Sequence, residues 1–240
     1  MCIRDRSEGA IGSDRIINML NVHQDQLVVE EKGIYSIENF LNARRLMYWQ
    51  VYLHKTSVAA EKMMVALIER AQLLVRTGVE VPCTRELHLF LANPIETNHL
   101  ISDPNLLDAY CLIDDYDIWS GIKAWQHHRD KVLSSISRMF LSRHLFQIKL
   151  GLEPITVDFD LLRQRIATQF NFNHQEDVDF MIRQGVITNA AYTSGDSGIS
   201  ILTKQGEVMD IAEASDLPNI VALGKIVKKH YLTWPKSVTL

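Results

Sequence analysis

The amino-acid sequence predicts a mainly α-helical protein with a C-terminal α+β part. The stretch 35–71 contains neither Gly nor Pro, which is typical of a long helix. Shorter stretches between residues 84 and 140 each start with a polar or acidic residue and continue with an apolar stripe. After Arg143 the apolar spacing changes from the helical period to the strand period of two. We therefore expect a helical bundle over residues 7–142 and a small antiparallel α+β sandwich over residues 143–240.

The N-terminal part is expected to lead into the long helix through short elements. Residues 13–19 read as a short helix and residues 27–29 as a brief extended piece. The helical region then runs from about residue 36 to residue 76. Thr56 can act as a second N-cap within it, so we expect one bent helix or two helices in tandem. Gly78 ends the region, because glycine favours the position after a helix.

The middle of the chain is predicted to be helical. Its helices are expected over residues 84–91, 104–112, 115–125 and 130–140. Asp114, Asp115 and Asp117 crowd one helix start, where carboxylates satisfy free amides and the helix dipole, so we assign them to capping and not to a metal. The segment HHRD at residues 127–130 lies at a junction between helices, and we interpret it as a loop rather than a ligand set.

The last hundred residues read as strands with intervening helices. Strands are expected over residues 145–150, 179–183, 199–202, 207–211 and 226–232, and helices over residues 159–170 and 219–223. The third and fourth strands flank a turn at residues 204–206 and read as a hairpin. TSGDSG at residues 193–198 is interpreted as a loop, because it lacks the lysine and spacing of a phosphate-binding loop.

The composition is that of an ordinary globular protein. Of the 240 residues 47% are hydrophobic and 22% charged, and the formal net charge is −4. We therefore expect no broad binding to nucleic acid or to an anionic membrane, and no apolar run is long enough to span a bilayer. Cys2, Cys83 and Cys111 are scattered without metal-type spacing, which favours a reducing cytoplasm. Residues 1–6 have no apolar pattern and resemble a translated sequencing adapter, so we expect a non-native tail, with a short disordered native tail as the alternative.

The long helix carries the candidate binding residues. At about 100° per residue, Arg44, Tyr48, Tyr52 and Lys55 fall within roughly 80° of one another. Apolar residues such as Leu41 share this face, so we expect it to point inward. Burying an arginine, a lysine and two tyrosines is costly, which suggests the wall of a pocket for an anionic, partly flat ligand. The alternative is an amphipathic helix whose long side chains extend outward from the edge of a core.

The same helix resembles a known family. The run RRLMYWQVYLHKTSVAAEKMM, with SIENFLNA before it, resembles the helix after the metal site in HD-superfamily phosphohydrolases. Within this superfamily the run resembles the bacterial relatives of the sterile-alpha-motif and HD-domain deoxynucleoside triphosphate triphosphohydrolase. SEGAIGSDRIINML resembles the segment that leads to this helix, and IDDYDIWSGIKAW and FLSRHLFQIKL extend the resemblance weakly towards the C-terminus. The helical part would then be the remnant of an HD domain.

The resemblance implies a metal-dependent enzyme whose catalytic centre is missing from this chain. The family binds a divalent metal (Mg, Mn, Zn or Fe) through a His, an adjacent His-Asp pair and a later Asp, all before the long helix. This chain contains no His-Asp pair, and its only histidine before Tyr35 is His23. We therefore predict no catalytic residue, metal ligand or bound cofactor here, and expect a C-terminal fragment that is inactive alone.

The resemblance also assigns roles to the candidate residues. Arg44, His54 and Lys55 map to positions near the triphosphate or a neighbouring nucleotide site, and Tyr48 and Tyr52 to positions beside the sugar. A family member with a well-known site has histidine where this chain has Tyr48, which makes the sugar contact less secure. The implied function is hydrolysis of deoxynucleoside triphosphates by the full-length protein, as a homo-oligomer. The alternative is a module for oligomerisation or nucleotide sensing that needs no metal.

Overall fold

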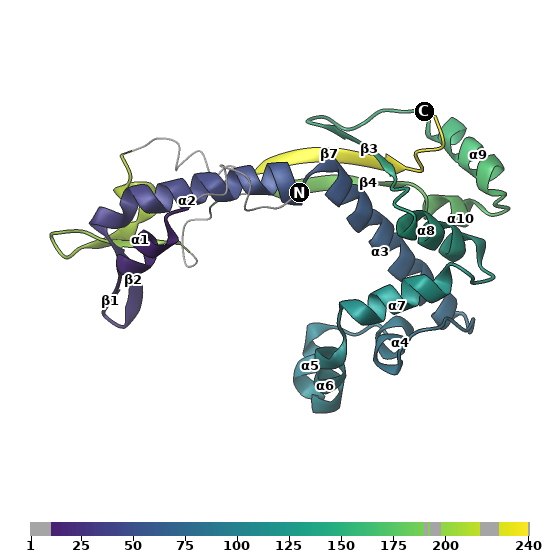
Figure 1. Ribbon diagram of the computed structural model, residues 1–240, viewed down its shortest axis with the longest axis horizontal. Helices are drawn as coiled ribbons and strands as arrows, with labels where there is room; N and C mark the ends of the chain where they lie inside the picture. The colour runs from purple at the N-terminus through teal and green to yellow at the C-terminus, as the bar shows by residue number, and fades with distance from the viewer. Residues whose placement is uncertain (1–10, 190–191, 193–197, 217–225, 240) are drawn as a thin grey trace. The chain divides into compact units, whose positions relative to one another are not determined.

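The computed structural model describes residues 11–189, 192, 198–216 and 226–239. The chain divides into two compact units (Figure 1). Unit 1 comprises residues 1–57 and 186–229, and unit 2 comprises residues 58–185 and 230–240. Each unit is therefore assembled from segments that are far apart in the sequence. The boundary predicted between residues 142 and 143 falls inside unit 2.

Unit 1 contains a four-stranded sheet in the order β1-β2-β5-β6. Its strands are β1 (Leu20–His23), β2 (Gln26–Glu30), β5 (Ser200–Leu202) and β6 (Val208–Asp210). β1 and β2 form an antiparallel hairpin, as do β5 and β6, whereas β2 and β5 run parallel with Val29 opposite Ile201. Gln24 and Asp25 both have positive φ, which is the conformation that a tight two-residue hairpin turn requires. The parallel pair thus joins the N-terminal and C-terminal segments of unit 1.

Helical elements complete unit 1. They are α1 (Ser13–Asn18), the 3₁₀ turn η3 (Glu31–Gly33), α2 (Ile34–Met47), the π turn η4 (Tyr48–Tyr52) and α11 (Ile211–Ala214). Of these, α1, α2 and α11 contribute to the core against the apolar face of this sheet. α2 contributes Ile34, Ile37 and Leu41 to a core that also contains Ile201 and Ile211. These α2 positions are three or four residues apart, so they lie on one side of the helix. The beginning of the long predicted helix is therefore anchored in unit 1.

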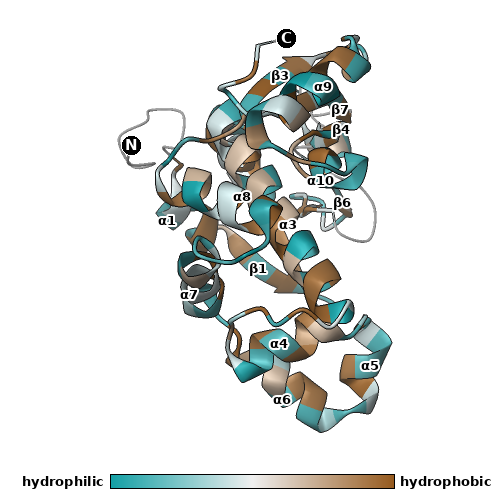
Figure 2. Cartoon of the chain, turned by 90° about the vertical axis from the view of Figure 1, so that its right-hand side faces the viewer, coloured by the Kyte–Doolittle hydropathy of each residue, from teal (hydrophilic) through white to brown (hydrophobic). Residues whose placement is uncertain are grey.

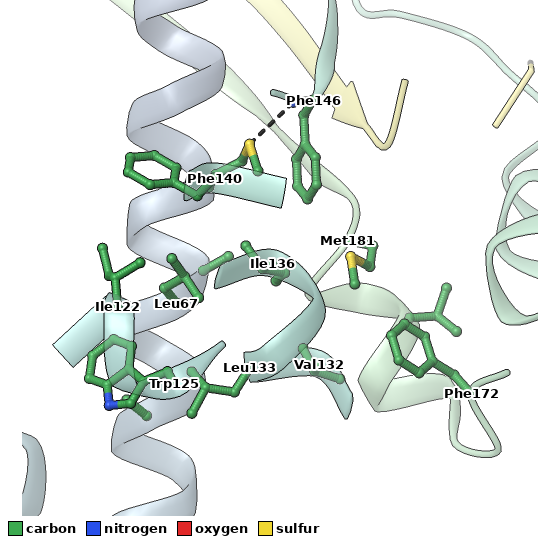
Figure 3. Packing of buried hydrophobic residues seen from close by; sticks show 14 of the residues in the cluster. Leu67, Ile122, Trp125, Val132, Leu133, Ile136, Phe140, Phe146, Phe172 and Met181 are labelled. Atoms are coloured by element: carbon green, nitrogen blue, oxygen red, sulfur yellow. Dashed lines mark hydrogen bonds between the residues drawn. The ribbon is translucent and has the colours of Figure 1, made fainter. Parts of the chain in front are cut away.

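Unit 2 is mainly helical. Its helices are α3 (Lys55–Arg76, which begins in unit 1), α4 (Arg85–Ala92), α5 (Thr97–Ser102), α6 (Pro104–Leu112), α7 (Asp115–Trp125), α8 (Lys131–Leu141), α9 (Phe159–Phe170) and α10 (Gln175–Asp179). α3, α7 and α8 share one core, in which Leu67, Trp125 and Ile136 are fully buried (Figure 3). The indole N–H of Trp125 donates to the carbonyl of Pro82 at 2.8 Å, so its one polar group is satisfied.

A three-stranded sheet in the order β3-β7-β4 packs onto this core. Its strands are β3 (Gln147–Gly151), β7 (Val227–Trp234) and β4 (Arg183–Asn189). β3 and β7 are antiparallel, with Gln147 opposite Trp234. Just before β3, the backbone N–H of Phe146 faces the sulfur of Met63 at 3.2 Å (Figure 3), so the predicted domain boundary lies within a packed region.

The predicted fold class is confirmed, since the chain is mostly helical with a C-terminal region rich in antiparallel sheet. The long helical region is two helices in tandem, separated after η4. The prediction of a strand over residues 179–183 was wrong. The helix α10 ends at Asp179, and the strand β4 begins only at Arg183. β1 and α5 were not predicted. The tail at residues 1–6, the helix at 219–223 and most of the loop at 193–198 lie outside the described residues.

Candidate functional site

The predicted site residues surround a π-helical turn in unit 1. In η4 the backbone N–H of Leu53 donates to the carbonyl of Tyr48 at 2.7 Å. This bond spans five residues instead of the four of an α-helix, so the turn accommodates one extra residue. Such turns are frequent at functional sites. η4 therefore separates the candidate residues into those before, within and after an interruption of the helix.

Arg44, Tyr48 and Tyr52 form a continuous row, which we call the Arg-Tyr-Tyr row. The guanidinium carbon of Arg44 lies 5.2 Å from the centroid of the Tyr48 ring. The Tyr48 and Tyr52 ring centroids are 5.3 Å apart, with the ring planes at 60°, an edge-to-face arrangement. Contacts of these kinds contribute about 0.5–1 kcal/mol each at exposed sites. The row presents a cation, two ring faces and two hydroxyl groups on one surface.

His54 and Lys55 follow the row and behave differently from each other. His54 accepts a hydrogen bond at its Nδ1 from the backbone N–H of Thr56, at 3.2 Å. It therefore stabilises the beginning of α3 by satisfying one of the free amides. Lys55 is exposed, and its side chain forms no ion pair with any residue that the structure describes. Of the two, Lys55 has the free charge that an anionic ligand would use.

The orientation of these residues differs from the prediction. Ile37 and Leu41 are buried as expected, but Arg44, Tyr52 and Lys55 are exposed. The π turn changes the angular spacing beyond its start, so a constant 100° per residue no longer applies. Long side chains at the edge of a core also reach outward to water. The exposure agrees with the alternative of an amphipathic helix with outward-reaching side chains, and ligand binding by these residues stays a prediction.

A contact that was not predicted also involves η4. The ammonium nitrogen of Lys229, on β7, is 3.9 Å from the centroid of the Trp49 ring, within η4. Both residues belong to unit 1. Nothing in the sequence indicates this pair, because its members are far apart along the chain. Lys229 therefore places a second cation next to an aromatic side chain of η4, that of Trp49.

The cavity behind the hairpin of unit 1 does not suit an anion. It has a volume of about 370 Å³ and is lined by α1, β1, β2 and α2, with residues such as Ile16, Leu20 and Phe40. Its lining includes Ser13 and Ser200 but no charged residue. An anionic ligand would lose its hydration there without gaining a compensating charge. The exposed Arg-Tyr-Tyr row is therefore the better candidate.

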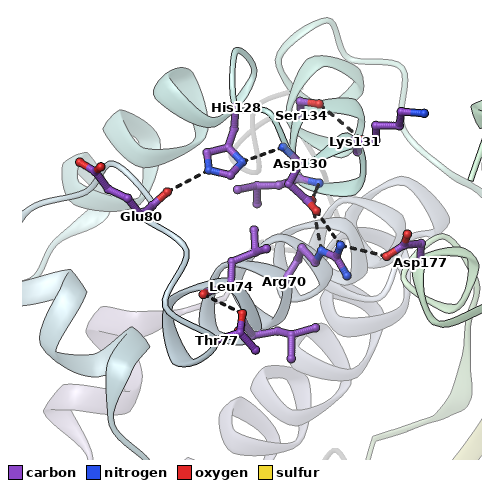
Figure 4. A network of polar contacts seen from close by, with 11 residues as sticks. Arg70, Leu74, Thr77, Glu80, His128, Asp130, Lys131, Ser134 and Asp177 are labelled. Carbon is purple, nitrogen blue, oxygen red and sulfur yellow. Dashed lines mark hydrogen bonds and ion pairs between the residues drawn. The ribbon is translucent and has the colours of Figure 1, made fainter. Parts of the chain in front are cut away.

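The segment HHRD is a loop, as predicted, and belongs to a structural network in unit 2 (Figure 4). His128 contacts the carbonyl of Glu80 through Nε2 at 3.0 Å, and its Nδ1 accepts from the backbone N–H of Asp130 at 3.0 Å. Asp130 caps α8 by accepting from the N–H of Leu133 at 2.8 Å. Asp114 and Asp117 form a reciprocal capping box at the start of α7, which agrees with the assignment to capping.

The described residues do not fit a catalytic metal. No group of three or more His, Cys, Asp or Glu side chains among them is arranged to hold an ion. What the row can do chemically is bind a planar or anionic group through Arg44, Tyr48 and Tyr52.

Comparisons with known proteins reveal similarity to HD-related proteins and to a phosphohydrolase. The family model for the HD associated region matches residues 11–80, which include α2, η4 and α3. A crystal structure of a phosphohydrolase from Bacteroides thetaiotaomicron is similar, with a TM-score of 0.83 and 45% sequence identity, over 95% of this chain and 57% of that one. These two findings support a relation to an HD-related family of phosphohydrolases, as the resemblance in the sequence predicted.

Two further similarities bear on length and fold. YwfO, an uncharacterized protein of Bacillus subtilis, is 24% identical over 97% of this chain and 52% of its own length. The chain spans about half the length of the curated relatives it matches. A hypothetical protein from Aquifex aeolicus shares the fold, with a TM-score of 0.56 and 20% identity. In the described residues, no helix is long and apolar enough to cross a membrane.

Proposed function

We propose that this chain acts as the nucleotide-binding part of a metal-dependent HD-type phosphohydrolase that cleaves deoxynucleoside triphosphates. The HD associated region and the similarity to a protein named phosphohydrolase support the reaction class. The single observation that carries the substrate class is the Arg-Tyr-Tyr row, in which the half-buried ring of Tyr48 lies between the exposed side chains of Arg44 and Tyr52. The metal ligands would come from a part of the protein beyond the residues described here.

Each residue of the site has a role in this proposal. Arg44 offers a planar fork of donors that matches the geometry of phosphate oxygens. Lys55 adds a point charge, and its exposed ammonium has no competing carboxylate among the described residues. Tyr48 and Tyr52 supply ring faces and hydroxyl groups for the sugar. His54 acts indirectly, because its Nδ1 is already used to begin α3.

A module that binds nucleotide without hydrolysing it is the second candidate. It is favoured by the same exposed row, which can hold a ligand without a metal. Both candidates predict nucleotide binding, and only the first predicts that the longer protein releases triphosphate.

Two assays separate the candidates. We expect calorimetry to detect binding of deoxynucleoside triphosphates to this chain, and to detect less binding for Arg44→Ala. We expect no hydrolysis by this chain with Mg²⁺ or Mn²⁺, and metal-dependent hydrolysis by the longer protein that contains it. Hydrolysis by the chain alone that is lost on changing one of its own residues would contradict the assignment of the metal site elsewhere. Binding without hydrolysis by the longer protein would favour the second candidate.

A further inference from the structure

The cavity of unit 1 has the composition of a pocket for a small molecule. Its volume is about 370 Å³, and its described lining comes from residues 11–20, 27–29, 37–40 and 199–200. Apart from Phe40, Ser13 and Ser200, every residue of this lining is Ile, Leu or Val. Pockets for small molecules have volumes of roughly 300–1,000 Å³ and are mainly apolar, with a few polar groups. The cavity therefore falls within this class, although the Arg-Tyr-Tyr row makes no use of it.

The cavity combines a buried inner wall with an exposed apolar rim. Val28, Val29 and Ile37 form the inner wall and are at most 4% exposed. Ile17 and Leu27 form the rim and are 62% and 66% exposed. Figure 2 shows hydrophobic residues on β1, the strand that contributes Leu20 to the lining. A ligand can therefore enter from water and reach a surface that water contacts poorly.

Water is a poor occupant of this cavity. At about 30 Å³ for each water molecule, the volume corresponds to roughly twelve of them. A buried water needs two to four polar partners, and the only polar side chains of the described lining are those of Ser13 and Ser200. An apolar ligand would instead remove its own surface and that of the lining from water, which is favourable. The cavity therefore favours an apolar ligand over water.

The chemistry of the lining also restricts the charge of the ligand. No charged side chain contributes to the described lining, so an ionised group would lose its hydration without gaining a counter-charge. A hydroxyl group both donates and accepts hydrogen bonds, so Ser13 on α1 and Ser200 on β5 suit a neutral polar group. The aliphatic side chains of the remaining lining suit methylene groups. The preferred ligand is therefore uncharged, with one polar end and an apolar body.

We propose that the cavity of unit 1 is a binding site for an unbranched alkyl chain with a neutral polar head group. If a methylene takes about the space of a water molecule, the volume accommodates a chain of about ten carbon atoms. The chain would lie against the inner wall, and the head group would bond to the hydroxyl of Ser13 or Ser200. This proposal does not depend on the proposed function, because it uses neither the Arg-Tyr-Tyr row nor a metal.

A series of straight-chain alcohols tests the site in the full chain. The neutral dye N-phenyl-1-naphthylamine fluoresces more strongly in apolar surroundings, so its displacement reports the binding of each alcohol. From 1-hexanol to 1-decanol, each added methylene should lower the dissociation constant about fourfold, and the gain should end once the chain exceeds the cavity. Decanoate and decyltrimethylammonium should each bind at least about tenfold more weakly than 1-decanol, because the lining carries no charge of either sign.

Changes in the size of the cavity locate the binding. Ser200→Phe places a ring in the lining and should weaken the binding of 1-decanol at least about tenfold. Ser120→Phe is the matched control, because Ser120 is exposed on α7 and outside the lining, and it should leave the binding unchanged. Phe40→Leu makes the wall smaller by about three carbon atoms, so the longest chain that still gains affinity should grow by about three methylenes.

The two cavity variants keep the test decisive even if one of them unfolds. Circular dichroism should show which variants are folded, and Phe40→Leu should strengthen the binding of longer alcohols rather than abolish binding. Failure of every alcohol to displace the dye, no dependence on chain length, or equal binding of decanoate and 1-decanol would each overturn the proposal. An unchanged chain-length preference in folded Phe40→Leu would also overturn it, and would assign the apolar rim to contact with another polypeptide.

Discussion

Arg70 on α3 holds the carboxylate of Asp130 with two hydrogen bonds, from Nε to Oδ1 at 3.1 Å and from Nη2 to Oδ2 at 2.6 Å (Figure 4). The same guanidinium lies 2.9 Å from Asp177 on α10. The side chains of Arg70 and Asp130 are only 10% and 13% exposed, so the pair is largely shielded from water. Because Asp130 also caps α8, Arg70 and its two carboxylate partners link three helices of unit 2, α3, α8 and α10.

Removing either partner of this pair should destabilise unit 2. Arg70→Ala leaves two carboxylates without their cation, and Asp130→Ala also removes the cap of α8. We expect each change to lower the free energy of unfolding by about 3–5 kcal/mol, as for other shielded pairs that lose one partner. Urea unfolding followed by circular dichroism measures this change. Arg163→Ala, which breaks a more exposed pair with Asp179, should cost less than about 1 kcal/mol. Equal losses for both arginines would show that shielding has no effect here.

The Asp130 pair should also make unit 2 sensitive to acid. Burial alone would raise the pKa of Asp130, but the hydrogen bonds from Arg70 and Leu133 and the nearby positive charges outweigh it, and the pKa is lowered. A lowered pKa in the folded state means that the carboxylate stabilises the fold above its unfolded pKa of about 4. This contribution is lost as the pH falls through the folded pKa. We therefore expect the urea midpoint to fall with acidification below about pH 4.

Asp130→Asn is the matched variant for this pH dependence. The amide keeps the size of the side chain but cannot titrate, so the variant should be less stable at neutral pH and lose less stability below about pH 4. If the urea midpoint of Asp130→Asn depends on pH as it does in the unmodified protein, the acid sensitivity comes from other carboxylates.

Gly33 should not tolerate a side chain. A Cβ at this position would lie 2.6 Å from Cγ1 of Val29, closer than such atoms approach, and 3.1 Å from Cβ of Met19, which is tighter than most contacts of this kind. Gly33→Ala should therefore destabilise unit 1 by about 1–3 kcal/mol through overpacking. Gly12→Ala is the control, because a Cβ there would meet nothing closer than 3.9 Å. The urea midpoints of both variants give the comparison. A neutral Gly33→Ala would mean that the hairpin and η3 can move apart.

The helices that the sequence predicted best have signals within their own residues. α9 spans residues 159–170 as predicted, because Asp158 caps its start at 2.9 Å from Leu161 and Asn171 ends it with a φ of 53°. Strand pairing depends on distant residues instead. The parallel pairing of Val29 with Ile201 joins segments that are far apart in the sequence, and no local pattern indicates it. The division into units was missed for the same reason.

In the candidate site, too, the sequence predicts contacts between nearby residues but not those that depend on distant ones. Helical spacing correctly places Arg44 beside Tyr48 and Tyr48 beside Tyr52, since positions four residues apart are neighbours. The spacing favoured an inward face, whereas Arg44 and Tyr52 are exposed. The π turn changes the direction of the positions after Tyr48, and the long side chain of Arg44, which precedes the turn, reaches outward to water. The contact of Lys229 with Trp49 depends on the path of β7, which the sequence does not specify locally.

Within the longer protein that we propose, Arg44→Ala should weaken catalysis more than Tyr52→Phe. The guanidinium of Arg44 would contact phosphate, and a charge-assisted hydrogen bond contributes about 1.5–3 kcal/mol. Its loss should lower kcat/KM for deoxynucleoside triphosphates by about ten- to a hundredfold. Tyr52→Phe keeps the ring against Tyr48 and loses only the hydroxyl, so it should change the preference between ribose and deoxyribose more than the affinity for phosphate. Arg15→Ala, an exposed arginine on α1, is the charge control and should leave kcat/KM unchanged. If folded Arg44→Ala and Tyr52→Phe proteins both hydrolyse substrate like the unmodified enzyme, the Arg-Tyr-Tyr row serves only to stabilise η4.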